Sequence, residues 1–349
     1  MGSALDNDLQ VKSNEISENQ RVIWNDIYIS GTGRFIPSMR PINDIQVDGV
    51  PNDHTIVQSD YISFTEADEP ATVMATRAAT EALTTSELVS ADVGVLIYAA
   101  IIGDAHHFAP VCHVQRVLRA PDALAFELSA ASNGGTQGIA VAANLMTADA
   151  SVKAALVCTA YRHPIDIISR WSSGMVFGDG AAAAVLSRDG GMVRLISGYH
   201  GSLPELEVLA RNRSNERLGF VLPDVGLGKY LTAIARMYQA VIAQVLEEAQ
   251  TSIAEIDYFG LIGIGIPSLT ATILEPNGIP VNKTSWGLLR QMGHVGACDP
   301  LLSLNHLFEQ NVLKRGDKVL LLGGGVGYRL TCIVAEIAMN PGVPGHSTS

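Results

Sequence analysis

The sequence predicts an α/β protein in which helices cover the faces of buried strands. Three observations lead to this class: apolar runs alternate with helical patterns, 33 of the 349 residues are glycine, and only 17% are charged. Buried strands read as continuous apolar runs, whereas a helix repeats its apolar positions every three or four residues. A typical soluble chain carries about 25% charged residues, so the low value indicates extensive burial, consistent with an oligomer.

The first half of the chain contains most of the expected strands. An alternating run at 22–29 precedes a glycine-rich turn at 31–33, and a polar loop with prolines extends from about 41 to 64. Helical spacing of apolar residues predicts helices at 71–82, 111–118 and 134–148. Short apolar runs predict strands at 93–99, 125–128, 154–159 and 181–186.

The second half repeats this alternation after a variable middle. An amphipathic helix is predicted at 230–249, a strand at 257–266, a helix at 301–310, and a strand at 318–322 that ends at three glycines. Each half ends with a glycine-containing turn that leads into an apolar strand, at 177–186 and 322–337. This repetition is consistent with a duplicated core.

Composition argues against several classes of protein. The net charge of −12 and the lack of clustered Lys or Arg argue against nucleic acid and anionic membrane surfaces as partners. No apolar run reaches the roughly 18 residues of a membrane span. The four cysteines lack metal-ligand spacing, which predicts reduced thiols in the cytoplasm and no metal. Residues 1–20 lack the apolar core of a secretory signal and, like 341–349, are expected to be flexible.

Ser132 is the first candidate for chemistry. It follows an apolar strand, lies among small residues and immediately precedes the helix expected from residue 134. A nucleophile at a helix N-terminus can use its own backbone amide to stabilise an oxyanion. Serine is also a preferred helix N-cap, and this local pattern alone favours the cap.

The glycine run at 323–325 is the second candidate. Glycines after a buried strand allow a backbone N–H to approach a reacting carbonyl, although an ordinary tight turn has the same sequence pattern. No Gly-Lys-Ser/Thr ending follows, so the run is not a phosphate-binding loop.

His294 and Asp299 form the third candidate, in a loop of small residues. Histidine is the natural general base near neutral pH, and a carboxylate can fix its tautomer. The alternative is a loop histidine, with Asp299 capping the helix that starts near Pro300; both interpretations can hold together. Cys298 is interpreted as a packing residue. The residues alone do not distinguish His294 from the other histidines in suitable positions, His106, His107, His113 and His163.

Four motifs occur in the order and at the intervals of the β-ketoacyl-ACP synthase III family: SAASNG at 129–134, FGDGA at 177–181, GHVGACDP at 293–300 and GGG at 323–325. The resemblance extends from about residue 22 to 337. It implies a thiolase fold with a duplicated five-layer α-β-α-β-α core and an obligate homodimer. Residues 21–190 would form the half with the nucleophile, and 191–340 the half with the His/Asp pair and the glycine-rich loop. Phe108 would enter the partner's pocket.

The sequence departs from the family pattern at the residues that carry condensation. Ser132 occupies the cysteine position, residues 263–268 contain no histidine, and His294 occupies the asparagine position. In the family, the His and Asn together stabilise the enolate that forms when a malonyl group loses CO2. Because this sequence lacks both at those positions, decarboxylative condensation is not expected. What is left is a nucleophile, a base and an orienting acid in Ser132, His294 and Asp299, with the Ser132 and Gly325 amides as oxyanion hole.

The resemblance therefore predicts a cytoplasmic acyltransferase of secondary metabolism, such as polyketide or antibiotic biosynthesis. It would move an acyl group from a CoA or acyl-carrier-protein thioester through Ser132 to a hydroxyl or amine of a small-molecule acceptor, with no further cofactor. One alternative is a starter-unit ketosynthase III that uses serine with acyl-CoA and malonyl-ACP. Another is an inactive partner subunit of a ketosynthase heterodimer. Three arginines would meet the CoA phosphates or lie in a solvated loop: Arg211, Arg213 and Arg217.

Overall fold

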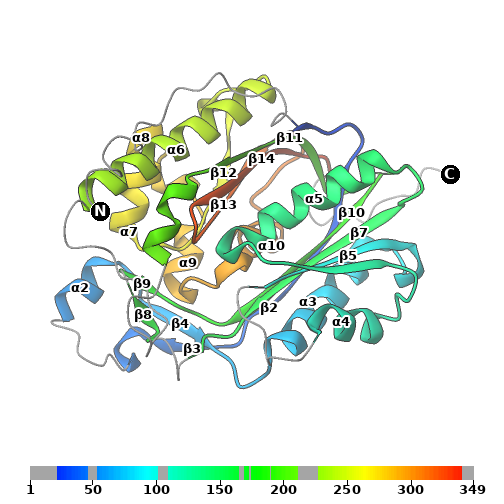
Figure 1. The fold of residues 1–349 in the computed structure, drawn as a ribbon, viewed down its shortest axis with the longest axis horizontal. Coiled ribbons are helices and arrows are strands. Elements are labelled where there is room, and N and C mark those ends of the chain that lie inside the picture. Colours follow the sequence, from blue (N-terminus) through cyan, green and yellow to red (C-terminus); the bar gives the residue numbers. More distant parts are fainter. Residues whose placement is uncertain are drawn as a thin grey trace.

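One mixed β-sheet runs through the molecule (Figure 1). The computed structural model describes residues 22–45, 53–100, 109–164, 169–172, 174–188, 190–210 and 227–339. In this part of the chain ten strands pair in the order β12-β13-β14-β11-β2-β10-β7-β5-β6, and β1 pairs with β11. Two short ribbons, β3-β4 and β8-β9, stand apart from this sheet.

The large sheet has two sections that correspond to the two halves of the chain. The first section contains β2 (Tyr28–Phe35), β5 (Val93–Ala100), β6 (Leu124–Leu128), β7 (Ala154–Tyr161) and β10 (Gly180–Ser187). The second contains β1 (Val22–Ile23), β11 (Val193–Ser202), β12 (Tyr258–Gly260), β13 (Lys318–Gly325) and β14 (Arg329–Ile337). The sections meet where β2 and β11 pair antiparallel, with Ile29 opposite Val193.

Helices cover both sections and fill the space between them. Two helices, α3 (Ala71–Ser86) and α4 (Pro110–Leu118), pack on the outer face of the first section. The helix α6 (Leu227–Glu248) packs on the outer face of the second section. Between the sections lie α5 (Gly134–Ala148) and α10 (Asp299–Glu309), both of which contact strands of both sections (Figure 1). The predicted five-layer α-β-α-β-α architecture is therefore confirmed.

The remaining described elements are short. The ribbons are β3 (Ser38–Pro41), β4 (Ser63–Glu66), β8 (Trp171–Ser172) and β9 (Met175–Val176). The helices are α2 (Asp53–Gln58), α7 (Ile266–Leu269), the π-helix η7 (Thr270–Leu274), α8 (Glu275–Asn277) and α9 (Trp286–Met292). Single 3-10 turns are η2 (Ile42–Asp44), η3 (Ser90–Asp92), η4 (Ala131–Asn133), η6 (Ile253–Glu255), η8 (Val281–Lys283) and η9 (Gly296–Cys298), and η5 spans Pro204–Ala210. None of the described helices has both the length and the apolarity that a membrane span requires.

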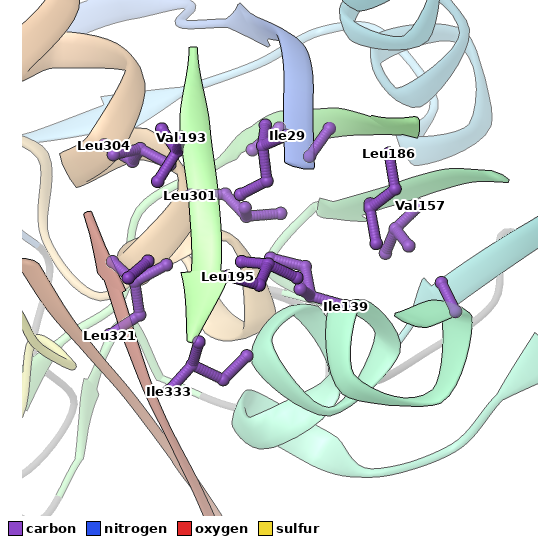
Figure 2. Packing of buried hydrophobic residues seen from close by; sticks show 14 of the residues in the cluster. Ile29, Ile139, Val157, Leu186, Val193, Leu195, Leu301, Leu304, Leu321 and Ile333 are labelled. Atoms are coloured by element: carbon purple, nitrogen blue, oxygen red, sulfur yellow. The ribbon is translucent and has the colours of Figure 1, made fainter. Parts of the chain in front are cut away.

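The largest part of the core lies in the middle layer, around α5 and α10. Side chains from both sheet sections meet there and are withdrawn from solvent (Figure 2). They include Ile29, Ile139, Val157, Leu186, Val193, Leu195, Leu301, Leu304, Leu321 and Ile333. Each such side chain contributes about 1.5–3 kcal/mol by leaving water, so this layer fixes how the two halves sit against each other.

The expected glycine-rich turn at 31–33 is wrong. Gly31 and Gly33 lie inside β2, which runs unbroken from residue 28 to 35. A Cβ on either glycine would collide with backbone carbonyl oxygens of α3, those of Ala82 and Ala78. The glycines are therefore needed for the close approach of helix to sheet and not for a turn.

The strand predicted at 257–266 is also wrong over most of its length. β12 ends at Gly260, and α7 begins at Ile266 after an irregular stretch. Gly265 has a φ of 76°, which residues with a Cβ seldom adopt, and Pro267 favours the first turn of a helix. This departure from the sheet brings residues 261–265 to the candidate site. The predicted loop at 41–64 likewise contains a helix, α2.

Candidate active site

Ser132 lies where the first sheet section leads into the middle helix layer. After β6 the chain makes the turn η4, and α5 begins at Gly134. Ala131 has a φ of 49°, in the left-handed region. This conformation costs an alanine free energy, so it persists only where the surrounding structure imposes it. The N-cap interpretation of Ser132 is wrong, because Asn133 occupies the cap position of α5. The Ser132 hydroxyl pairs instead with His294, at 2.8 Å from Oγ to Nε2.

His294 connects Ser132 to a fully buried carboxylate. Its Nδ1 lies 2.6 Å from Oδ2 of Asp299, and the imidazole is itself only 3% exposed. The Asp299 carboxylate accepts two further hydrogen bonds, from the backbone N–H of Gly263 (2.7 Å) and of Val295 (2.8 Å). Asp299 is the first residue of α10, and its side chain caps no helix. The capping interpretation of Asp299 is therefore wrong, whereas the contact with His294 is present.

These contacts determine which nitrogen of the imidazole carries a proton. A carboxylate has no proton to donate, so with Asp299 as a carboxylate Nδ1 of His294 is the donor to Oδ2, beside the N–H of Gly263. In the neutral imidazole Nε2 is then left as an acceptor, and it faces the hydroxyl of Ser132. The chain Ser132–His294–Asp299 is thus arranged to remove a proton from the serine.

Tyr61 holds the loop that supports Asp299. Its hydroxyl donates to the carbonyl oxygen of Gly263 (2.7 Å) and accepts the N–H of Gly265 (3.0 Å). Burial, with a smaller contribution from the charge of Asp299, raises the pKa of Tyr61 well above its ordinary value. The hydroxyl therefore stays protonated and keeps donating. Sequence reasoning missed Tyr61, which lies in a polar loop without a motif.

The FGDGA segment fixes the backbone of His294. His294 donates its N–H to the Val176 carbonyl (2.7 Å), and its own carbonyl accepts the N–H of Gly178 (3.0 Å). The ring of Phe177 lies 5.6 Å from the imidazole, centroid to centroid. Asp179 is fully buried and binds both terminal nitrogens of Arg170, at 3.1 and 2.8 Å. The motif therefore holds the base in place and does not itself supply a reactive group.

The three glycines of the second candidate segment lie beside the Ser132 turn. They are the last residues of β13 and pair with β14, so the expectation that they only follow a strand is wrong. A Cβ on Gly325 would lie 2.6 Å from the Ala130 carbonyl oxygen and 3.1 Å from the Ser132 nitrogen. Only glycine allows this approach, which brings the two segments that were predicted to form an oxyanion hole side by side.

A mostly apolar pocket opens in front of Ser132 and His294. Its volume is about 190 Å³. Segments from β9, α6, α7, η7 and the β13–β14 hairpin line it, together with the irregular stretch after β12. Besides Ser132 and His294, the lining residues are Met175, Phe177, Leu231, Ile234, Tyr238, Ile262, Ile264, Ser268, Thr272, Gly324, Gly325, Val326, Tyr328 and Leu330.

Three other candidates that the structure describes, Cys298, His163 and His113, do not join this site. Cys298 is fully buried against Thr159 and Gly180, and burial raises the pKa of its thiol, in keeping with a packing residue. His163 is buried and pairs with the hydroxyl of Tyr161 (2.9 Å), and His113 lies on α4. Six further candidates lie outside the described residues: His106, His107, Phe108, Arg211, Arg213 and Arg217. Among the residues that are described, no group of three or more His, Cys, Asp or Glu could hold a metal ion.

Comparison with known proteins gives a consistent result for sequence and fold. Residues 126–201 match the 3-oxoacyl-[acyl-carrier-protein] synthase III family, and residues 246–337 match its C-terminal region. The β-ketoacyl-[acyl-carrier-protein] synthase III 2 of Bacillus cereus is 25% identical over 319 residues, which cover 88% of this chain and 97% of that protein. The synthase III of Clostridium beijerinckii is 26% identical over 327 residues, which cover 88% and 98%.

Two solved structures have the same fold. The acyltransferase ChlB3 superposes with a TM-score of 0.83 at 26% identity, covering 91% of this chain and 99% of its own. The synthase III of Aquifex aeolicus gives 0.76 at 22% identity, covering 89% and 99%. The chain is therefore similar in sequence to 3-oxoacyl-[acyl-carrier-protein] synthase III proteins, and it has the thiolase fold of these structures.

Proposed function

We propose that this protein is an acyltransferase that loads an acyl group from a CoA or acyl-carrier-protein thioester onto Ser132 and passes it to a small molecule. The observation that carries this proposal is the continuous chain from Ser132 through His294 to Asp299, with contacts of 2.8 and 2.6 Å. A serine hydroxyl is a poor nucleophile until a base removes its proton, and His294 is placed to act as that base.

The first half-reaction forms an acyl-serine. Ser132 Oγ bonds to the thioester carbonyl carbon while its proton passes to Nε2 of His294. The C–S bond then breaks, and the imidazolium returns the proton to the departing thiolate. Asp299 stabilises the imidazolium between these steps. The amides of Ser132 and Gly325 and the N-terminus of α5 would stabilise the oxyanion, which is supported by the close approach of Gly325 to the Ser132 nitrogen.

The second half-reaction transfers the acyl group. His294 takes a proton from the hydroxyl or amine of the acceptor, which bonds to the acyl carbon. The bond between that carbon and Ser132 Oγ then breaks, and the imidazolium returns the proton to Oγ. An oxygen ester is less activated than a thioester, so a hydroxyl or amine is the favoured acceptor. Water would hydrolyse the acyl-serine, and the apolar lining of the pocket opposes its entry.

The lining of the pocket favours acyl transfer over decarboxylative condensation. Among the described lining residues His294 is the one imidazole, and no asparagine is present. Asn133 lies next to the nucleophile, but its side-chain amide donates to Thr331 (3.1 Å) and Gln137 (3.3 Å). The His and Asn pair that would stabilise an enolate is therefore not found among the described residues of this pocket.

The wider biological setting belongs to the same proposal. We place the reaction in secondary metabolism, in the cytoplasm and in a homodimer whose Phe108 contributes to the partner's pocket, with no cofactor besides the donor. These parts rest on the sequence resemblance. The similar fold of the acyltransferase ChlB3 supports the reaction class.

Intact-protein mass spectrometry tests the proposal directly. The protein is incubated with a panel of acyl-CoAs and acyl-ACPs, in parallel with Ser132→Ala, His294→Ala and Ser268→Ala. Ser268 lines the same pocket, and the hydrogen bonds of the His294 ring go to Ser132 and Asp299, so Ser268→Ala is the matched control. We expect a mass increase that equals the acyl group, is lost in Ser132→Ala and persists in Ser268→Ala.

Two other results would replace the proposal. No adduct with any donor would favour an inactive partner subunit. A carbon–carbon bond formed from malonyl-ACP would identify a starter-unit ketosynthase.

A further inference from the structure

The pocket beside Ser132 combines an uncharged lining with a few hydroxyl groups. Among its described residues there is no Lys, Arg, Asp or Glu, and most side chains are aliphatic or aromatic. The hydroxyl-bearing residues besides Ser132 are Tyr238, Ser268, Thr272 and Tyr328. An acyl group bound here has no described ionic partner, so the pocket is suited to a neutral one.

The hydroxyl of Tyr238 is the unusual polar group in this pocket. Tyr238 projects from α6 and is only 5% exposed. Within the part of the chain that the structure describes, its hydroxyl has no hydrogen-bond partner. Two other tyrosines that are equally buried do use theirs: Tyr61 binds Gly263 and Gly265, and Tyr161 binds His163. The hydroxyl of Thr272, also in the pocket, donates to the Ser268 carbonyl.

Tyr238 lines the same pocket as the reacting centre. Its hydroxyl is 2.7 Å from the position that a Cβ on Gly324 would occupy, and Gly324 lines the pocket with Gly325. Ser132 and His294 line this pocket as well. An acyl group that is attached to Ser132 and extends along the pocket can therefore approach the hydroxyl.

We propose that the acyl group transferred by this protein carries an oxygen substituent, a hydroxyl, keto or ether oxygen, that hydrogen-bonds the hydroxyl of Tyr238. The inference rests on the proposed function, because it concerns the group loaded onto Ser132. The carbonyl carbon of the acyl group bonds to Ser132 Oγ, and this pocket opens in front of Ser132. Burial raises the pKa of Tyr238, which keeps the hydroxyl protonated as a donor.

Such a hydroxyl discriminates against hydrocarbon acyl groups. A hydrocarbon that fills the pocket excludes water from the O–H of Tyr238 and leaves it without a partner. An unsatisfied donor without water costs free energy that a matching oxygen removes. We expect the oxygen-bearing donor to acylate Ser132 about tenfold faster or more, in the range of one neutral hydrogen bond in a dry site.

Two pairs of donors with equal numbers of heavy atoms test this inference. 3-Hydroxybutyryl-CoA is compared with isovaleryl-CoA, and 4-hydroxybutyryl-CoA with valeryl-CoA, so that in each pair a hydroxyl replaces a methyl group. Acylation rates are measured by mass spectrometry for the wild type, Tyr238→Phe and, as a pocket control, Ser268→Ala. We expect at least one pair to favour the hydroxylated donor, and this preference to disappear in Tyr238→Phe but not in Ser268→Ala.

The outcomes separate this inference from the proposed function. Rates within about twofold in both pairs, or a preference that persists in Tyr238→Phe, would overturn the inference while the acyl-serine stands. If Tyr238→Phe slows only the transfer of the acyl group from Ser132 to the acceptor, the hydroxyl binds the acceptor. That result would also overturn the inference. No adduct with any donor would overturn the proposed function and this inference together. Because Tyr238→Phe keeps the ring, labelling by the hydrocarbon donors shows that this variant is folded.

Discussion

Replacing Asp299 by asparagine tests whether the buried carboxylate directs the imidazole. The carboxylate accepts three hydrogen bonds, from His294 Nδ1 and from the amides of Gly263 and Val295. Asparagine must place its NH₂ group at one of the two oxygen positions. At Oδ2 it faces both the imidazole and the Gly263 N–H, and at Oδ1 it faces the Val295 N–H. Every orientation thus sets one donor against another.

The size of the effect follows from these contacts. An amide NH₂ facing Nδ1 imposes the other tautomer, so that Nε2 carries a proton and can no longer accept one from Ser132. In serine triads this exchange lowers turnover about 10⁴-fold. We therefore expect Asp299→Asn to slow acylation of Ser132 by about 10³- to 10⁴-fold, equivalent to about 4–5.5 kcal/mol of activation free energy. The opposed donors should also lower stability by about 1–3 kcal/mol.

The assay compares single-turnover acylation in the wild type, Asp299→Asn, Ser132→Cys and the double variant. A thiol ionises without strong help from a base, so Asp299→Asn should cost the Ser132→Cys background much less, about tenfold. Urea unfolding verifies that each variant is folded. If Asp299→Asn acylates within tenfold of the wild type, or if both backgrounds lose equally, the assignment of His294 as a base oriented by Asp299 is refuted.

Three further predictions concern stability and support of the site. Gly31→Ala should lower the free energy of unfolding by about 1–3 kcal/mol, because its Cβ meets the α3 backbone. Gly287→Ala is the control and should not destabilise the protein, because the space around Gly287 is open. Equal effects of the two substitutions in urea unfolding would contradict this prediction. Tyr61→Phe should cost about 1–3 kcal/mol and slow acylation by releasing Gly263; unchanged acylation would show that the loop needs no such support. Hydrogen bonds from its capping-box partner lower the pKa of Glu255 to about 2. Its contribution should be present above pH 4.5 and lost toward pH 2, so the melting temperatures of wild type and Glu255→Gln should converge as pH falls; a constant gap would count against it.

Regular, strongly patterned segments were predictable from the sequence. The helix predicted at 134–148 and the strand predicted at 154–159 correspond to α5 and β7. A helix repeats its apolar positions every three or four residues, and a strand buried on both faces is a continuous apolar run. Gly31 and Gly33 misled the prediction because a glycine required by a neighbouring helix has the same local signal as one in a turn. The distinction depends on α3, which is about 40 residues away in the chain.

The candidate site was predictable in part for a similar reason. Ser132, His294 and Asp299 occur in motifs, and the structure brings their side chains together. The support from Tyr61 was not predictable, since a single tyrosine in a polar loop has no pattern that connects it to a glycine 202 residues away. Tyr238 is part of an amphipathic helix, and its sequence position does not reveal that its hydroxyl ends in a pocket.

A reactive serine also changes which chemicals can inactivate the site. Thiolate nucleophiles are oxidised by peroxide through sulfenic to sulfonic acid, whereas an alcohol is inert to these reactions. Three of the four thiols, those of Cys158, Cys298 and Cys332, are buried with raised pKa values, and the exposed Cys112 lies on α4. No cysteine is among the described residues that line the pocket. The proposed acyl transfer through Ser132 should therefore be insensitive to peroxide and to thiol-alkylating agents at its reacting atom.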